Sequence, residues 1–217
     1  MESTAASAPR TASRRLTLRG GPEGNEQLTS ITGVLLIILL AVLGVTILRI
    51  GQLIWLHLFI GLLLIGPMAL KMASTGYRFV RYYTHDRVYR KKGPPAAALR
   101  LLAPGVVLST VVVFVSGLVL LFVGPANRGT SLLIHKASFI AWGVLTALHV
   151  LGHVPGLGTT VRGAAVVRDG LGIPGGGGRW LALAGAIVGG LVLAIVLIPD
   201  FSVWTAADAL RHHHHDG

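Results

Sequence analysis

The sequence predicts an all-α integral membrane protein with five transmembrane helices in an up-and-down bundle. The chain has 217 residues, of which 53% are hydrophobic and 12% are charged. Soluble domains usually carry about 25% charged residues, so a water-soluble fold is disfavoured. Five apolar stretches are each long enough to cross the hydrocarbon core, where a helix satisfies its own backbone hydrogen bonds. Together these observations define the fold class.

The apolar stretches divide the chain into five spans and short connections. Residues 1–30 are rich in Ser, Thr, Ala, Gly and Arg, and we expect a disordered tail there. The first apolar stretch starts late and lacks a small-residue cleavage pattern, which favours a retained anchor over a cleaved signal peptide. The transmembrane domain is expected over residues 31–199 and a second tail over 200–217, with spans at about 31–50, 53–75, 101–123, 131–152 and 180–199.

Basic residues predict the direction of the spans. Of the 19 Lys and Arg residues, 15 fall on one side, in the N-terminal tail, in the connections that follow the second and fourth spans, and at Lys71 near the end of the second span. The other side receives Arg49, Arg128, Lys136 and Arg211. The positive-inside rule therefore predicts a cytoplasmic N-terminus and an extracytoplasmic C-terminus. The net charge of +11 is explained mostly by topology, and nucleic-acid binding is disfavoured.

The absence of cysteine limits the cofactors that the chain can hold. Without Cys there are no disulfides, iron–sulfur ligands or c-type haem attachments. No span contains Asp or Glu, which weakens the hypothesis of a carboxylate-based proton pump. Ionisable groups inside membrane helices are costly, so each is a candidate for function. The candidates are His57 and Lys71 in the second span, and His135, His149 and His153 in or directly after the fourth.

The spacing of these residues predicts a shared face. His135 and His149 are 14 residues apart, which brings them within about 40° of each other on a helix. His153 returns to the same face after five turns. We expect this face to lie opposite the second span, where His57 matches the depth of His135 and Lys71 matches that of His149.

Two histidines at equal depth on facing helices are typical axial ligands of a haem. The outer pair, His57 with His135, is complete, whereas the inner tier pairs His149 with Lys71. The alternative for the histidines is hydrogen bonding between helices. Lys71 has three interpretations: an iron ligand, a contact to a propionate or quinone, or an amine that reaches the headgroups. For His153, solvation at the interface is the alternative.

At these positions the chain resembles the membrane-embedded b-type cytochromes. The resemblance covers about residues 53–153 and rests on His57 in WLHLFIGLLLIGP and on His135 and His149 in LLIHKASFIAWGVLTALHVLGH. It implies that these histidines ligate haem iron and that small residues on the same helices make room for the macrocycle, namely Gly61, Gly66 and Gly143. The departure from the family pattern is Lys71, which puts a second haem in doubt.

Three further residues are candidate cofactor contacts. Trp142 lies seven residues from both His135 and His149, where it packs between haems or simply in the core. Arg128 and Lys136 lie near the outer tier, where they are candidates to pair with haem propionates. The alternative is that they have no role in the site, since the membrane topology also allows basic residues at these positions.

The resemblance implies a haem b electron-transfer subunit of an oxidoreductase. We expect it to carry electrons between the quinone pool and a partner redox protein in the cytoplasmic membrane of a bacterium. One haem is expected, and a second and a bound quinone remain open. The rival hypothesis is a non-redox transporter or accessory subunit whose histidines only link helices. An intramembrane enzyme ranks last, because the spans lack Asp, Glu and Cys.

Overall fold

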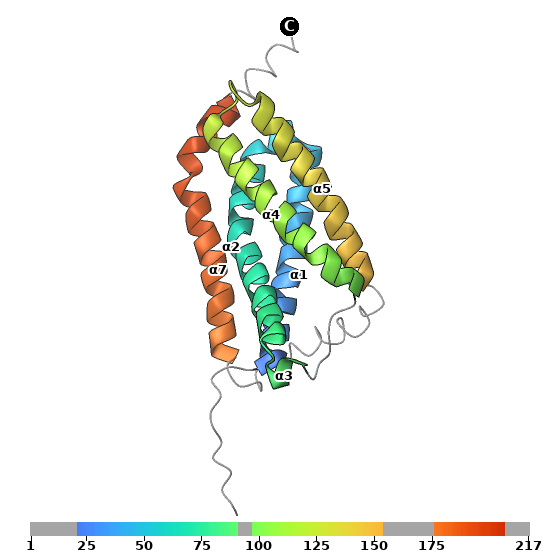
Figure 1. The fold of residues 1–217 in the computed structure, drawn as a ribbon. Coiled ribbons are helices and arrows are strands. Elements are labelled where there is room, and N and C mark those ends of the chain that lie inside the picture. The colour runs from blue at the N-terminus through green and yellow to red at the C-terminus, as the bar shows by residue number, and fades with distance from the viewer. Residues whose placement is uncertain (1–20, 91–96, 154–175, 207–217) are drawn as a thin grey trace, which may run out of the picture.

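Five long helices lie side by side in the computed structural model, which describes residues 21–90, 97–153 and 176–206 (Figure 1). Each is long and apolar enough to cross a membrane, and the described residues contain no strand. This confirms the predicted all-α membrane fold class. The elements are α1 (Gly21–Leu48), α2 (Ile50–Tyr83), α3 (Arg87–Arg90), α4 (Ala97–Val123), α5 (Gly129–His153), α7 (Gly176–Val196) and the 3₁₀ helix η4 (Ile198–Phe201).

The first helix begins earlier than the sequence predicts. Residues 21–30, which we expected in the disordered tail, form the first turns of α1. Their polar side chains are held on α2: Asn25 Nδ2 donates to the Ser74 carbonyl, and the Thr29 and Ser74 hydroxyls are 3.0 Å apart. These tertiary contacts, which apolar periodicity does not reveal, explain the correction. The rest of the predicted tail, residues 1–20, lies outside the described residues.

The long helices form two groups. In the first, α2 lies against both α1 and α7, and we call α1, α2 and α7 the three-helix group. In the second, α4 lies against α5 to form the α4–α5 hairpin, while α2 and α4 have few contacts. At one end η4 contacts α2, α4 and α7, and Trp204 just beyond it donates from Nε1 to the Leu121 carbonyl at 3.2 Å. The segment after α7 therefore links the two groups.

Glycines bring α2 and α7 into close contact. A Cβ atom added to Gly66 would collide with the Ala186 carbonyl oxygen, and one added to Gly190 would collide with that of Leu63. Because Pro67 has no N–H, the Leu63 carbonyl lacks its usual partner in the helix and lies instead against Gly190. Small residues allow such approaches in membrane helices. Gly66, which the family resemblance assigns to the macrocycle, therefore serves helix packing.

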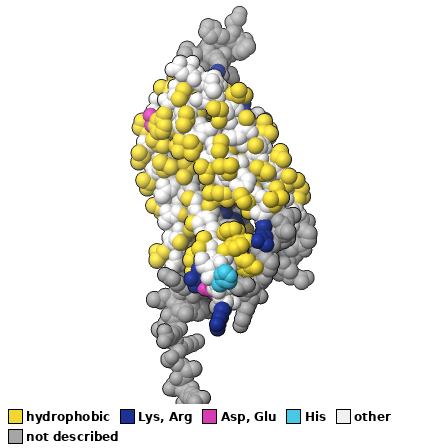
Figure 2. Space-filling model, viewed as in Figure 1, with side chains coloured by type: hydrophobic (Ala, Val, Ile, Leu, Met, Phe, Trp, Pro, Cys, Tyr) yellow, Lys and Arg dark blue, Asp and Glu magenta, His cyan; other side chains and the backbone are white. Residues whose placement is uncertain are grey.

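The outer surface is mainly apolar. On the face drawn in Figure 2, hydrophobic side chains cover the helical body, and most Lys and Arg side chains gather toward the end where α3 lies in Figure 1. Large hydrophobic residues are exposed along all five long helices, among them Ile37, Leu108, Ile140 and Leu181. A surface of this kind suits the interior of a lipid bilayer.

Candidate functional site

A cavity of about 600 Å³ lies between the three-helix group and the α4–α5 hairpin. This volume falls within the range of about 300 to 1,000 Å³ that is usual for small-molecule sites. Leucine, isoleucine and valine side chains from α1, α2, α4 and α5 form most of its wall. His57 of α2 and His135 of α5 both line it. The structure thus brings the predicted outer pair to one cavity.

His57 is held by a hydroxyl of α1. Its Nδ1 atom lies 2.9 Å from Thr46 Oγ1, and that hydroxyl donates its own proton to the Leu43 carbonyl at 2.6 Å. A hydroxyl has a single proton, so Thr46 Oγ1 accepts from His57. This arrangement favours the form of the neutral His57 ring that carries its proton on Nδ1.

His135 has the same arrangement with α4. Its Nδ1 atom lies 3.1 Å from Ser116 Oγ, which donates to the Val113 carbonyl at 3.0 Å. Ser138 Oγ lies 3.3 Å from Ser116 Oγ. A Cβ atom on Gly117 would lie 3.2 Å from His135 Cε1, so glycine lets the ring lie close to α4. As with His57, the arrangement favours a proton on Nδ1.

In this form both imidazoles keep their lone pair on Nε2. Within the described helices, each ring bonds a hydroxyl of the helix beside it, and His57 and His135 do not hydrogen-bond to each other. A neutral imidazole whose other nitrogen donates to a fixed acceptor is the usual form of a metal-ligating histidine. Each ring can therefore offer one nitrogen, Nε2, to a metal centre.

A bare metal ion lacks further ligands at this site. Among the described residues, no group of three or more His, Cys, Asp and Glu side chains is placed to hold a metal ion. Two imidazoles do suit a metal whose other positions are filled by a macrocycle, as in haem proteins with two axial ligands. The donor set and the apolar walls together fit a haem better than a free ion.

Other predicted contacts also line the cavity. Arg128 and Lys136 lie on its wall beside the α4–α5 connection, and Gly61 lines the α2 side. Trp142 is fixed by a hydrogen bond of 3.0 Å from Nε1 to Thr110 Oγ1 on α4. The structure therefore places five predicted site residues and one predicted small residue around a single cavity. The site residues are His57, His135, Arg128, Lys136 and Trp142, and the small residue is Gly61.

The inner tier is arranged differently. Lys71 Nζ donates to the Thr29 carbonyl of α1 at 2.6 Å, and a Cβ atom on Gly33 would lie 3.1 Å from that amine. Lys71 is thus directed at α1. Neither Lys71 nor His149 nor Gly143 is among the residues that line the cavity. His153 is the last residue of α5, and its side chain lies outside the described residues.

The neighbour of the histidine face differs from the expected one. We expected the fourth span to face the second, but α5 packs against α4, and the cavity lies between α5 and α2. Sequence reasoning therefore missed the hydroxyl partners Thr46, Ser116 and Thr110. Their only signal in the sequence is that each is a polar residue within an apolar span.

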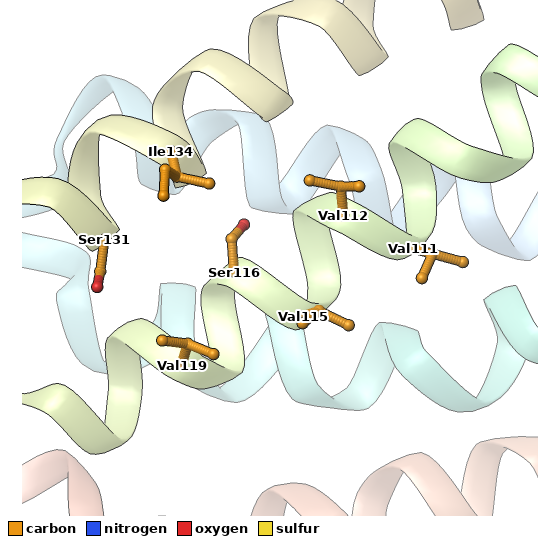
Figure 3. A pocket seen from close by; sticks show the side chains of 7 residues that line it. All are labelled: Val111, Val112, Val115, Ser116, Val119, Ser131 and Ile134. Carbon is orange, nitrogen blue, oxygen red and sulfur yellow. The ribbon is translucent and has the colours of Figure 1, made fainter.

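A second, smaller hollow lies on the α4–α5 hairpin. It measures about 290 Å³ and is lined by valines of α4 with Ile134, Ser131 and Ser116 (Figure 3). In Figure 3 the Ser116 hydroxyl points toward α5, and it is the same hydroxyl that bonds His135. The walls are almost entirely apolar, which suits lipid contact.

The comparisons with known proteins found nothing similar. The chain matches no protein family, no curated protein and no solved structure. The function is therefore argued from the geometry of the cavity.

Proposed function

We propose that this protein is a membrane electron-transfer protein that holds one b-type haem between His57 and His135. One observation carries the proposal: two histidines from different helices line one cavity, and each has its Nδ1 atom within hydrogen-bond distance of a hydroxyl. A bound haem would supply a one-electron iron couple. The fold class and the bilayer-facing surface are consistent with a haem protein of the membrane.

The cavity residues have distinct roles in this proposal. His57 and His135 hold the iron through Nε2, and the apolar walls exclude water, which tunes the potential. Arg128 and Lys136 neutralise the propionate carboxylates through charge-assisted hydrogen bonds. Trp142, fixed on Thr110, covers one side of the space. The protein binds, orients and shields the group and performs no bond chemistry of its own.

We propose one haem rather than two. The outer tier has two histidines at one cavity, whereas the amine of Lys71 already donates to the Thr29 carbonyl. An inner haem ligated by His149 and Lys71 would require Lys71 to leave this bond. The proposal therefore assigns Lys71 to the α1–α2 contact and leaves a quinone contact at this tier without support.

The charge distribution supports an orientation and a setting. We place the N-terminus in the cytoplasm and the C-terminus outside, because 15 of the 19 basic residues then face inward. In this orientation the cavity, with Arg128 at its edge, lies nearer the outer side. We propose that the protein serves an oxidoreductase in the cytoplasmic membrane of a bacterium and passes electrons between quinones and a partner redox protein.

The test is the optical spectrum of the purified protein after expression with ample haem. We expect reduced-minus-oxidised bands of haem b, with about one haem per chain. His57→Ala and His135→Ala should each abolish the bands, whereas His149→Ala, a matched change on α5, should keep them. Absence of bands from the unaltered protein, or bands that survive both cavity substitutions, would show that the proposal is wrong.

The rival hypothesis is a non-redox membrane protein. The hydrogen bonds from His57 to Thr46 and from His135 to Ser116 also suit histidines that only link helices. This hypothesis gives no role to the cavity or to the two basic side chains that line it, Arg128 and Lys136. It predicts an unpigmented protein in which the three histidine variants behave alike, and the same spectra therefore decide between the two.

A further inference from the structure

We propose that Thr46 and Ser116 are positioning residues that fix the protonation site and ring orientation of the two histidines. The proposal has two parts. The first, that these hydroxyls hold the proton on Nδ1, applies to the protein without any cofactor. The second, that they thereby set the ligand strength of both imidazoles, rests on the proposed haem function.

The hydroxyls can only accept from the histidines. Thr46 is fully buried and Ser116 is 7% exposed, so neither has ready access to water as a competing partner. Each donates its proton to a carbonyl one turn earlier in its own helix, Leu43 for Thr46 and Val113 for Ser116. With this proton committed, the histidine must be the donor in the shared hydrogen bond.

Each ring is held by a helix other than its own. The His57 ring of α2 is tied to α1, and the His135 ring of α5 is tied to α4. The orientation of both ligands therefore depends on two helix pairs that contact each other closely, α1 with α2 and α4 with α5. This explains why α1 and α4, which carry no histidine in their spans, are needed to build the site.

The chemical nature of the partners determines the ligand strength. A carboxylate acceptor pulls the Nδ1 proton strongly and gives the imidazole more negative character, which stabilises an oxidised metal. Here the acceptors are neutral hydroxyls, and no carboxylate is among the described residues that line the cavity. We infer that both ligands are ordinary neutral imidazoles, modestly strengthened by one hydrogen bond each.

The first experiment uses the haem-free protein. Nitrogen NMR of protein labelled with ¹⁵N-histidine reports which ring nitrogen carries the proton, and His57→Ala and His135→Ala assign the two signals. We expect the Nδ1–H form at both positions. Thr46→Val should shift only His57, and Ser116→Ala only His135, toward a mixture of the two forms.

Matched controls separate positioning from general stability. Thr32→Val removes another buried hydroxyl of α1, which donates to the Leu28 carbonyl in its own helix. Ser109→Ala removes a half-buried hydroxyl of α4, which donates to the Val106 carbonyl in its own helix. Neither should alter the histidine signals. Thr46→Ser keeps a hydroxyl and should restore the Nδ1–H form, even if Thr46→Val folds poorly.

The second experiment uses the haem-loaded protein. Losing either hydroxyl should weaken haem binding by about 10- to 100-fold, the usual effect of removing a partner behind a metal ligand. The midpoint potential should rise, because a less basic imidazole stabilises the oxidised iron less, and the control variants should keep the original value.

The outcomes of the two experiments are distinguishable. If the histidine signals are the same in Thr46→Val and Ser116→Ala as in the unaltered protein, the positioning proposal is overturned, whether or not haem binds. If the signals shift as expected but the unaltered protein binds no haem, positioning stands and the proposed function falls. If haem binds and its midpoint potential is unchanged by both substitutions, the second part of the proposal, which concerns ligand strength, is overturned.

Discussion

At the scale of single residues, the structure compensates for the cost of placing histidine in lipid. A polar nitrogen without a partner in an apolar medium costs about 1 to 3 kcal/mol by protein mutational data. The Nδ1 atoms of His57 and His135 avoid this cost through Thr46 and Ser116. Their Nε2 atoms belong to rings that line the cavity, where a bound metal would engage them.

Arg128 and Lys136 should influence the potential of the proposed haem. Removing either cation leaves a propionate charge less compensated, which favours the oxidised form. For partly exposed charges worth about 0.5 to 1 kcal/mol, Arg128→Gln should lower the midpoint potential by about 20 to 40 mV. Redox titration measures this shift. Arg49→Gln, which alters a cation at the same end that does not line the cavity, should leave the potential unchanged.

The sequence predicted the two cavity histidines but not the hydroxyl groups that bond them. Matched depth pointed to His57 and His135, because the rise per residue of a helix fixes the height of a side chain. The 14-residue spacing pointed to His149, which does not line the cavity. Thr46 and Ser116 could not be predicted in the same way. Their role depends on which helices pack together, and apolar helices with exposed hydrophobic residues on all sides give little information about their neighbours.

At the scale of elements, Lys71 ties α1 to α2. Its amine donates to the Thr29 carbonyl, next to the hydroxyl contact between Thr29 and Ser74. Gly33 leaves the space that the amine occupies. This polar cluster explains why α1 extends into residues that composition alone assigns to a tail.

Loss of this tie should affect α1 and leave the cavity intact. Lys71→Met should retain the haem spectrum, because the amine is directed at α1 and does not line the cavity. Hydrogen exchange should quicken over residues 21–30, where the helix loses an anchor on α2. Lys71→Arg keeps a cationic donor and should show a smaller change. Loss of the spectrum in Lys71→Met would instead support a ligand role for this lysine.

The contact between α2 and α7 should tolerate no side chain at Gly190. Gly190→Ala places a methyl group against the Leu63 carbonyl, and overpacking of this kind costs about 1 to 3 kcal/mol in free energy of unfolding. Gly189→Ala is the matched control, since a Cβ atom there meets nothing within 4 Å. Unfolding in mixed micelles compares the two. Equal stability of both variants would contradict this close helix contact.

At the scale of the whole molecule, the cavity separates the three-helix group from the α4–α5 hairpin. The groups meet through the segment after α7, where Trp204 bonds the Leu121 carbonyl, and through apolar side chains of α4, such as Leu121 and Phe114, that pack against α2. A ligand held by His57 on one side and His135 on the other would add a further link. The cofactor should therefore contribute to the stability of the bundle as well as to its chemistry.

Removal of haem should loosen the hairpin relative to the other helices. Hydrogen exchange in α5 should be faster in the haem-free protein, whereas α7, which packs on α2 and does not line the cavity, should change little. The comparison is made on one preparation before and after haem loading. Equal protection of α5 in both states would contradict the proposed link across the cavity.

The overall architecture was largely predictable, and its internal arrangement was not. Length and hydropathy located five spans, because any helix that crosses lipid must bury about 20 apolar residues. The separation into two groups depends on local features that hydropathy does not report, such as the fit of Gly66 and Gly190 between α2 and α7. The cavity follows from that separation, and so it appears only in three dimensions.

The central claim is that two neutral imidazoles hold one haem, and electron paramagnetic resonance of the oxidised protein tests it most directly. We predict a single low-spin ferric signal of the kind that two histidine ligands produce, with about one spin per chain. His57→Ala and His135→Ala should each eliminate that signal. A high-spin signal from the unaltered protein, or a low-spin signal that persists in either variant, would contradict the account.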